Sequence, residues 1–197
     1  MTEKAGSSQA SSMERRALHL ASDDRIRDEA QFRRLFDMHF DYVWRSLRRL
    51  GVPARDLEDL THDVFLRVYG QLHRYDSTRP LRPWLFAFVF RMASDYRRLS
   101  RNQRELLDAD VDVADPDASP VDRLVRAEAL SVGQAALECL DIERRAVFIL
   151  HELDGSPIPE VAAALAIPVN TAYSRLRSAR DQFDSAVRRL RLRRGDR

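Results

Sequence analysis

The sequence predicts an all-α protein with two small helical domains joined by a flexible acidic linker. Apolar residues recur at spacings of three and four along most of the chain, which is the period of an amphipathic helix. No segment of convincing length alternates with the period of two that marks a strand. The chain has 197 residues, of which 44% are hydrophobic, so it is long enough for one or two small domains with a core.

Charge is distributed unevenly, and this divides the chain into two halves. All but one of the 33 basic residues are arginine. Residues 91–105 carry a net charge of +3, residues 106–122 contain six Asp and no base, and residues 171–197 carry a net charge of +6. Low apolarity and two prolines further favour a linker over 102–120. We therefore expect two basic domains on either side of an acidic linker.

Composition also excludes several classes of protein. The longest apolar run, residues 83–90, is far shorter than the roughly 18 residues of a membrane-spanning helix, so we expect no membrane insertion. Residues 1–12 lack the apolar core of a signal peptide, which favours a cytoplasmic location. The single cysteine, the five scattered histidines and the dispersed glycines match no zinc signature or phosphate-binding loop. We expect no metal and no cofactor.

The N-terminal half begins with a polar, Ser-rich stretch, residues 1–24, which is predicted to be a disordered tail. Apolar periodicity then predicts a helix over about 29–50, ended by Gly51 in the left-handed conformation. A second helix is predicted over 56–72, with its acidic residues at the positive helix start.

Two prolines in residues 74–83 favour an irregular connection. The third helix, about 84–104, begins apolar and ends basic. Its aromatic residues are interleaved with arginines, and aromatic rings beside cations suit unstacked bases of single strands. The best candidates for phosphate contacts are Arg97, Arg98 and Arg101.

In the C-terminal half, apolar stripes over 121–153 predict two helices or one interrupted helix. A short helix over about 158–165 follows, with Ser156 as its expected cap. A tight break and a long helix over 170–190, capped by Asn170, come next. A short helix, a turn of three or four residues and a long helix have the spacing of a helix-turn-helix motif.

The predicted helix 170–190 has two different faces. Its apolar stripe contains Ala172, Leu176, Ala179, Phe183 and Val187. The opposite face contains Thr171, Ser174, Ser178 and Asp181, flanked by Arg175 and Arg177. Short polar side chains beside arginines suit insertion into a DNA major groove. An ordinary solvated helix face is the alternative interpretation.

The order of these parts resembles an extracytoplasmic-function sigma factor of bacterial RNA polymerase. Three stretches over about residues 29–190 carry the resemblance, and they occur in the order of the family. They are Asp56-Leu57-Glu58-Asp59-Leu60 followed by Val64-Phe65-Leu66-Arg67-Val68; Pro83-Trp84-Leu85 with Asp95 and Arg97-Arg98; and Thr171-x-x-Ser174-Arg175-Leu176 with Ala179-Arg180.

The resemblance implies sigma region 2 over 25–101, a linker over 102–120, sigma region 4 over 121–190 and a basic tail over 191–197. It implies promoter-specific transcription initiation with core RNA polymerase, through the clamp helices of the largest subunit and the flap. Promoter DNA and an anti-sigma factor are the other implied partners.

The resemblance also implies roles for individual residues. The implied polymerase-binding residues are Asp56, Asp59, His62, Asp63 and Arg67. Those implied for melting and recognising the −10 element are Tyr75, Arg79, Arg82, Phe90, Arg91, Arg97, Arg98 and Arg101. Those implied for recognising the −35 element are Asn170, Thr171, Tyr173, Ser174, Arg175, Arg177 and Ser178.

The chain departs from the family pattern at several of these positions. His62 stands where many members have Gln, and Arg91 where an Asn is frequent. In the predicted recognition helix, Asn170 replaces a frequent Gly, Tyr173 a frequent basic residue and Ser178 a frequent Arg. The resemblance therefore implies no particular promoter sequence for this chain.

Two other functions remain open from the residues alone. A self-sufficient helix-turn-helix regulator would need dimer symmetry to bind two half-sites, and no clear dimerisation coiled coil is present. An enzyme such as a nuclease would need convergent carboxylates, whereas the acidic residues here follow helix-start and linker patterns. We expect a protein that is not an enzyme.

Overall fold

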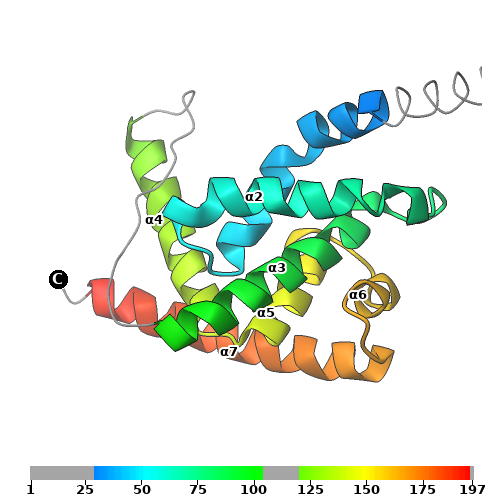
Figure 1. The fold of residues 1–197 in the computed structure, drawn as a ribbon. Coiled ribbons are helices and arrows are strands. Elements are labelled where there is room, and N and C mark those ends of the chain that lie inside the picture. Colours follow the sequence, from blue (N-terminus) through cyan, green and yellow to red (C-terminus); the bar gives the residue numbers. More distant parts are fainter. Residues whose placement is uncertain (1–28, 104–119, 196–197) are drawn as a thin grey trace, which may run out of the picture. The chain divides into compact units, whose positions relative to one another are not determined.

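The computed structural model describes residues 29–103 and 120–195, and all regular elements in these ranges are helical (Figure 1). This confirms the predicted all-α class. The predicted tail over 1–24 and all but the ends of the predicted linker over 102–120 lie outside the described residues.

The N-terminal half contains a helix over residues 29–49, α2 (Ala54–Tyr69), the short 3-10 helix η1 (Leu72–Arg74) and α3 (Leu81–Gln103). Between the first helix and α2 the chain turns at Gly51, whose φ of 93° lies in the left-handed region, as predicted. The turn is closed by a hydrogen bond of 3.1 Å from the Val52 amide to the Leu47 carbonyl.

The predicted apolar stripes form the core of this half. Helix α2 packs on α3. The fully buried side chains come from each helix and include Val43, Leu47, Leu57, Val64, Phe65, Leu85, Phe86 and Val89. Helix α3 begins at Leu81, earlier than the predicted Trp84, because Pro83 is compatible with a first helical turn, where no amide donor is needed.

The C-terminal half contains α4 (Pro120–Glu138), α5 (Ile142–Phe148), the π-helical turn η2 (Ile149–Leu153), α6 (Ile158–Ala164) and α7 (Val169–Gly195). The sequence left two helices or one interrupted helix open over residues 121–153, and the structure has separate helices there. Helix α5 is capped by Asp141, whose side chain accepts a 2.8 Å hydrogen bond from the Arg144 amide. In η2 the Asp154 amide donates to the Ile149 carbonyl at 3.0 Å, the wider spacing of a π turn.

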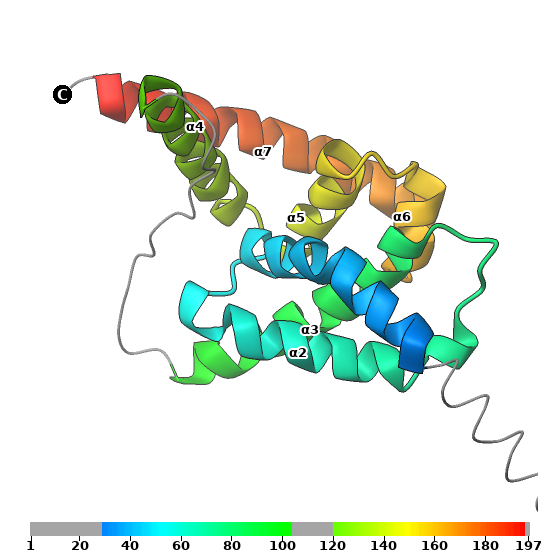
Figure 2. The same ribbon diagram turned by 90° about the horizontal axis from the view of Figure 1, so that it is seen from above.

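Helices α6 and α7 form the predicted helix-turn-helix. The turn between them contains Ala166 at a φ of 53° and is closed by a 3.0 Å hydrogen bond from the Ile167 amide to the Ala162 carbonyl. Figures 1 and 2 show α7 as a long helix that passes α5 and α6 along its first half and α4 along its second half. The phenyl rings of Phe148 and Phe183 stack at 4.6 Å and join α5 to α7.

Three details of this half differ from the prediction. Ser156 does not cap α6, because the helix begins after Pro157 and the Ser156 amide instead donates to the Leu150 carbonyl at 2.9 Å. Asn170 does not cap α7, because that helix already begins at Val169. Helix α7 also continues to Gly195, so residues 191–195 of the expected basic tail are helical.

Candidate functional sites

The first candidate site is the exposed side of α2. Leu57, Thr61, Val64, Phe65 and Val68 point into the core, so the residues between them face outward. Four of the five predicted polymerase-binding residues are exposed there: Asp59, His62, Asp63 and Arg67. Leu66 lies among them with 67% of its surface exposed, which is unusual for a large apolar side chain. We call Asp59, His62, Asp63 and Leu66 the α2 face.

The fifth predicted residue of this set, Asp56, is half-buried at the start of α2. Its carboxylate accepts a 2.6 Å hydrogen bond from the Tyr96 hydroxyl and lies 3.4 Å from the Arg55 Nε. These contacts join the start of α2 to α3. Asp56 therefore has a clear structural role in addition to the predicted one.

The second candidate site follows α2, where a loop leads into α3. The Tyr75 ring lies 4.9 Å from the Trp84 ring, and the Trp84 ring lies 4.8 Å from the Phe88 ring in an edge-on arrangement. The Arg91 guanidinium lies over Phe88, 4.8 Å from the ring centre. We call Tyr75, Trp84, Phe88 and Arg91 the aromatic row. Phe88 is 4% exposed and belongs to the core, whereas Trp84 is half-buried.

The loop itself is held by short-range hydrogen bonds. The Tyr75 hydroxyl donates to the Arg79 carbonyl at 2.6 Å, and burial raises the pKa of Tyr75. The Asp76 carboxylate accepts from the Thr78 hydroxyl at 2.7 Å and from the Thr78 amide at 3.0 Å, which lowers the pKa of Asp76. These bonds give the loop a defined conformation next to α3.

The residues predicted for the −10 element do not all lie on one side of α3. At about 100° per residue, Arg91 and Arg98 share the face of Trp84 and Phe88, whereas Phe90 and Arg97 lie on another face. The Arg97 Nη1 donates to the Leu50 carbonyl at 3.2 Å. The remaining members lie in the loop or at the helix ends: Tyr75, Arg79, Arg82 and Arg101. Arg97 therefore links α3 to the turn that follows the first helix.

The third candidate site is the exposed side of α7. Ala172, Leu176 and Ala179 are buried, as predicted from the apolar stripe. Asn170, Tyr173, Ser174 and Arg177 are exposed, and we call them the α7 outer face. The other three predicted −35 residues, Thr171, Arg175 and Ser178, are half-buried along one flank of the helix.

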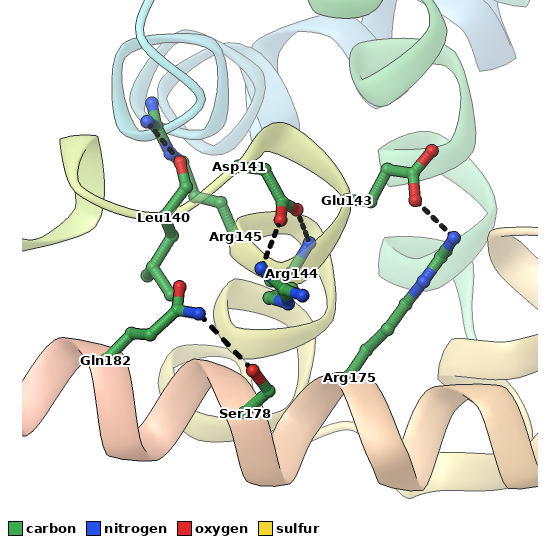
Figure 3. Close-up of polar contacts among 8 residues, drawn as sticks. All are labelled: Leu140, Asp141, Glu143, Arg144, Arg145, Arg175, Ser178 and Gln182. Carbon is green, nitrogen blue, oxygen red and sulfur yellow. Dashed lines mark hydrogen bonds and ion pairs between the residues drawn. The ribbon is translucent and has the colours of Figure 1, made fainter.

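Two of the α7 arginines are bound to carboxylates of neighbouring elements. Arg175 forms an ion pair with Glu143 of α5, and Figure 3 shows its side chain extended from α7 towards that carboxylate. Arg180 donates through Nε to Glu152 of η2 at 2.7 Å. Glu143 and Glu152 were not singled out by the sequence, because nothing local to either residue indicates a partner about 30 positions away.

Comparison with known proteins identifies the family to which the chain belongs. The model for sigma-70 region 2 matches residues 35–104, and the model for sigma-70 region 4 matches residues 134–183. The first match contains the α2 face and the aromatic row, and the second contains the α7 outer face. The chain belongs to the sigma-70 family of RNA polymerase sigma factors, in its extracytoplasmic-function group.

Several curated relatives match most of the chain. The chain is 30% identical to RNA polymerase sigma factor NccH of Alcaligenes xylosoxydans xylosoxydans, over 81% of this chain and 88% of the relative. It is 26% identical to the ECF RNA polymerase sigma-E factor of Escherichia coli K12, over 79% of this chain and 86% of the relative. The chain is thus a promoter-recognising sigma factor, not a self-sufficient regulator.

Two solved structures have a similar fold. CnrH, solved in complex with the cytosolic domain of CnrY, is 26% identical with a TM-score of 0.55, covering 80% of this chain and 87% of CnrH. The sigma factor RpoE from Bartonella quintana, solved with the anti-sigma factor NepR, shares the fold at 18% identity and a TM-score of 0.65, covering 80% of this chain and 97% of RpoE.

None of the helices in residues 29–103 and 120–195 is long and apolar enough to cross a membrane. Within the same ranges, no group of three or more His, Cys, Asp or Glu side chains could hold a metal ion.

Proposed function

We propose that the α2 face docks on the clamp helices of the polymerase largest subunit. Three polar or charged residues of this face, Asp59, His62 and Asp63, lie in the two turns before the exposed Leu66. An apolar residue within a charged rim is the arrangement in which burial supplies affinity and charge sets orientation and encounter rate. Leu66 is therefore added to the predicted polymerase-binding set, and region 4 is assigned the contact with the flap.

The aromatic row and the loop before it are assigned to the −10 element. Capturing a flipped base costs a few kcal/mol of unstacking, which aromatic stacking and hydrogen bonds offset. Trp84 and Tyr75 present half-buried rings beside the cation of Arg91. Arg79, Arg82 and Arg98 supply further positive charge near this surface, where single-stranded DNA would pass.

The α7 outer face is assigned to the −35 element. Its helix is the second of a helix-turn-helix, which is the helix that enters the major groove in this motif. Asn170, Tyr173, Ser174 and Arg177 project from its first two turns and are exposed. Thr171 and Ser178 flank that face, with Arg175 held beside them by Glu143.

The domain boundaries are proposed from the same assignments: region 2 over 25–101, a linker over 102–120, region 4 over 121–190 and a basic tail over 191–197. We further propose that the protein acts in the cytoplasm by binding rather than by catalysis, since its partners are polymerase and promoter DNA. An anti-sigma factor is a proposed partner, because CnrH, at 26% identity, was solved in complex with the cytosolic domain of CnrY.

The assignment of promoter recognition to this chain rests on the helix-turn-helix and its exposed α7 outer face. The test is to assemble the purified protein with bacterial core RNA polymerase, transcribe fragmented bacterial genomic DNA and sequence the transcript starts. We expect a stable complex and discrete start sites that share two spaced upstream elements. Folded protein that neither binds core polymerase nor directs initiation would contradict the proposal.

A further inference from the structure

Arg175 and Arg177 lie two residues apart on α7 but have different surroundings. The Arg175 side chain is 25% exposed, and its Nη2 is bound to Glu143 in the first turn of α5 (Figure 3). Arg177 is exposed, and within the described part of the chain it has no ion pair and no side-chain hydrogen bond. The capping of α5 by Asp141, which also binds the Arg144 guanidinium at 2.7 Å, fixes the position from which Glu143 extends.

This difference has an electrostatic consequence for DNA contacts. The Glu143–Arg175 pair has no net charge, so it attracts phosphate weakly, and a phosphate on Arg175 would also approach the Glu143 carboxylate. A guanidinium has five N–H donors, and only Nη2 of Arg175 binds Glu143. The remaining donors suit uncharged acceptors such as the O6 and N7 atoms of guanine. Arg177, without a counter-charge, suits a phosphate.

We propose that Glu143 is a positioning residue that determines promoter specificity, because it holds Arg175 for base recognition and prevents it from acting as a general phosphate contact. Arg177 supplies the phosphate contact. This inference rests on the proposed assignment of α7 to the −35 element, and it adds a residue outside the helix-turn-helix to that function.

The experiment measures DNA binding by the reconstituted holoenzyme. The probes are a promoter fragment found by the genomic transcription test and the same fragment with its upstream element scrambled, each over a range of salt. Glu143→Gln is expected to weaken binding to the intact fragment about two- to fivefold and to tighten binding to the scrambled one. The slope of log K against log salt should steepen by about 0.9, because Arg175 becomes free to bind phosphate. Arg177→Ala should make that slope shallower by a similar amount, with an unchanged ratio of affinities.

Two further variants make the test specific. Glu152→Gln removes the same charge but leaves Arg175 bound, so it should leave the ratio of the two affinities unchanged. In an Arg175→Ala background, Glu143→Gln should leave the ratio of the two affinities unchanged. The inference is overturned if Glu143→Gln tightens binding to both fragments equally, changes neither ratio nor slope, or acts equally without Arg175. If Arg175→Ala and Arg177→Ala both leave promoter binding unchanged, the assignment of α7 itself is wrong. Thermal unfolding confirms that each variant is folded.

Discussion

The ring of Tyr75 lies 4.9 Å from the ring of Trp84, and this contact attaches the loop after α2 to the first turn of α3. The hydroxyl of the same tyrosine closes the loop through the Arg79 carbonyl at 2.6 Å. One residue thus orients both the loop and the aromatic row. This relationship leads to the first prediction.

Tyr75→Ala is expected to slow promoter opening by roughly 2- to 12-fold, because an aromatic pair contributes about 0.5–1.5 kcal/mol beyond its buried area. Opening can be followed through the reactivity of unpaired thymines in the −10 region. Tyr75→Phe is the matched control, since it keeps the ring and removes only the hydroxyl, and its effect should be smaller. Equal effects of the two variants would show that the ring contact is not the important feature.

The second prediction concerns docking on core polymerase. Asp59→Arg reverses a charge on the α2 face and should weaken assembly roughly tenfold, with the largest effect at low salt. Its position is exposed, so the free energy of unfolding should change little. Asp41→Arg is the control, because Asp41 is 84% exposed on the preceding helix, outside the α2 face. Normal assembly of the Asp59→Arg variant would show that docking occurs elsewhere.

The third prediction compares two glycines. Gly51→Ala should destabilise the protein by about 1–2 kcal/mol, because φ is 93° and an added Cβ would lie 2.7 Å from the Arg145 Nη1. Gly133→Ala should stabilise it by about 0.5–1 kcal/mol, because Gly133 lies within α4 and an added Cβ would meet nothing within 4 Å. Urea unfolding of both variants measures these changes. The same sign for both substitutions would contradict the conformational argument.

The fourth prediction concerns the buried Arg145. Its side chain is 1% exposed, Nη2 donates to the Leu140 carbonyl at 2.9 Å, and Nε and Nη1 have no hydrogen-bond partner. Burial, together with the positive charge of Arg97, lowers the pKa of Arg145 to about 10. The charged form is thus less favourable in the folded than in the unfolded protein, and this cost is full at neutral pH and declines above pH 10.

Arg145→Met should therefore raise the free energy of unfolding at pH 7 by about 1–3 kcal/mol, since it removes two unsatisfied donors and a buried charge. Arg144→Met is the matched control. Arg144 is 38% exposed and paired with Asp141, so its loss should cost less than about 1 kcal/mol. Chemical unfolding at pH 7 measures both changes. Destabilisation of the Arg145→Met variant would show that the guanidinium has stabilising partners.

Sequence periodicity by itself determined the helical class, most helix positions and the helix-turn-helix. These features depend on local rules: apolar side chains at spacings of three and four form one helix face, and glycine permits the turn at Gly51. The same rules placed Asp59, His62 and Asp63 on the exposed side of α2. They also placed Ala172, Leu176 and Ala179 in the core, where the structure has them.

Only the tertiary structure decided which arginine side chains bind other groups of the protein. Arg175 and Arg97 appeared equivalent to other arginines, but Arg175 binds Glu143, 32 residues away, and Arg97 binds the Leu50 carbonyl, 47 residues away. Helical periodicity is a property of one segment, and it predicts which face of a helix is buried. Ion pairs join segments that are distant in the sequence, so they cannot be obtained from local patterns.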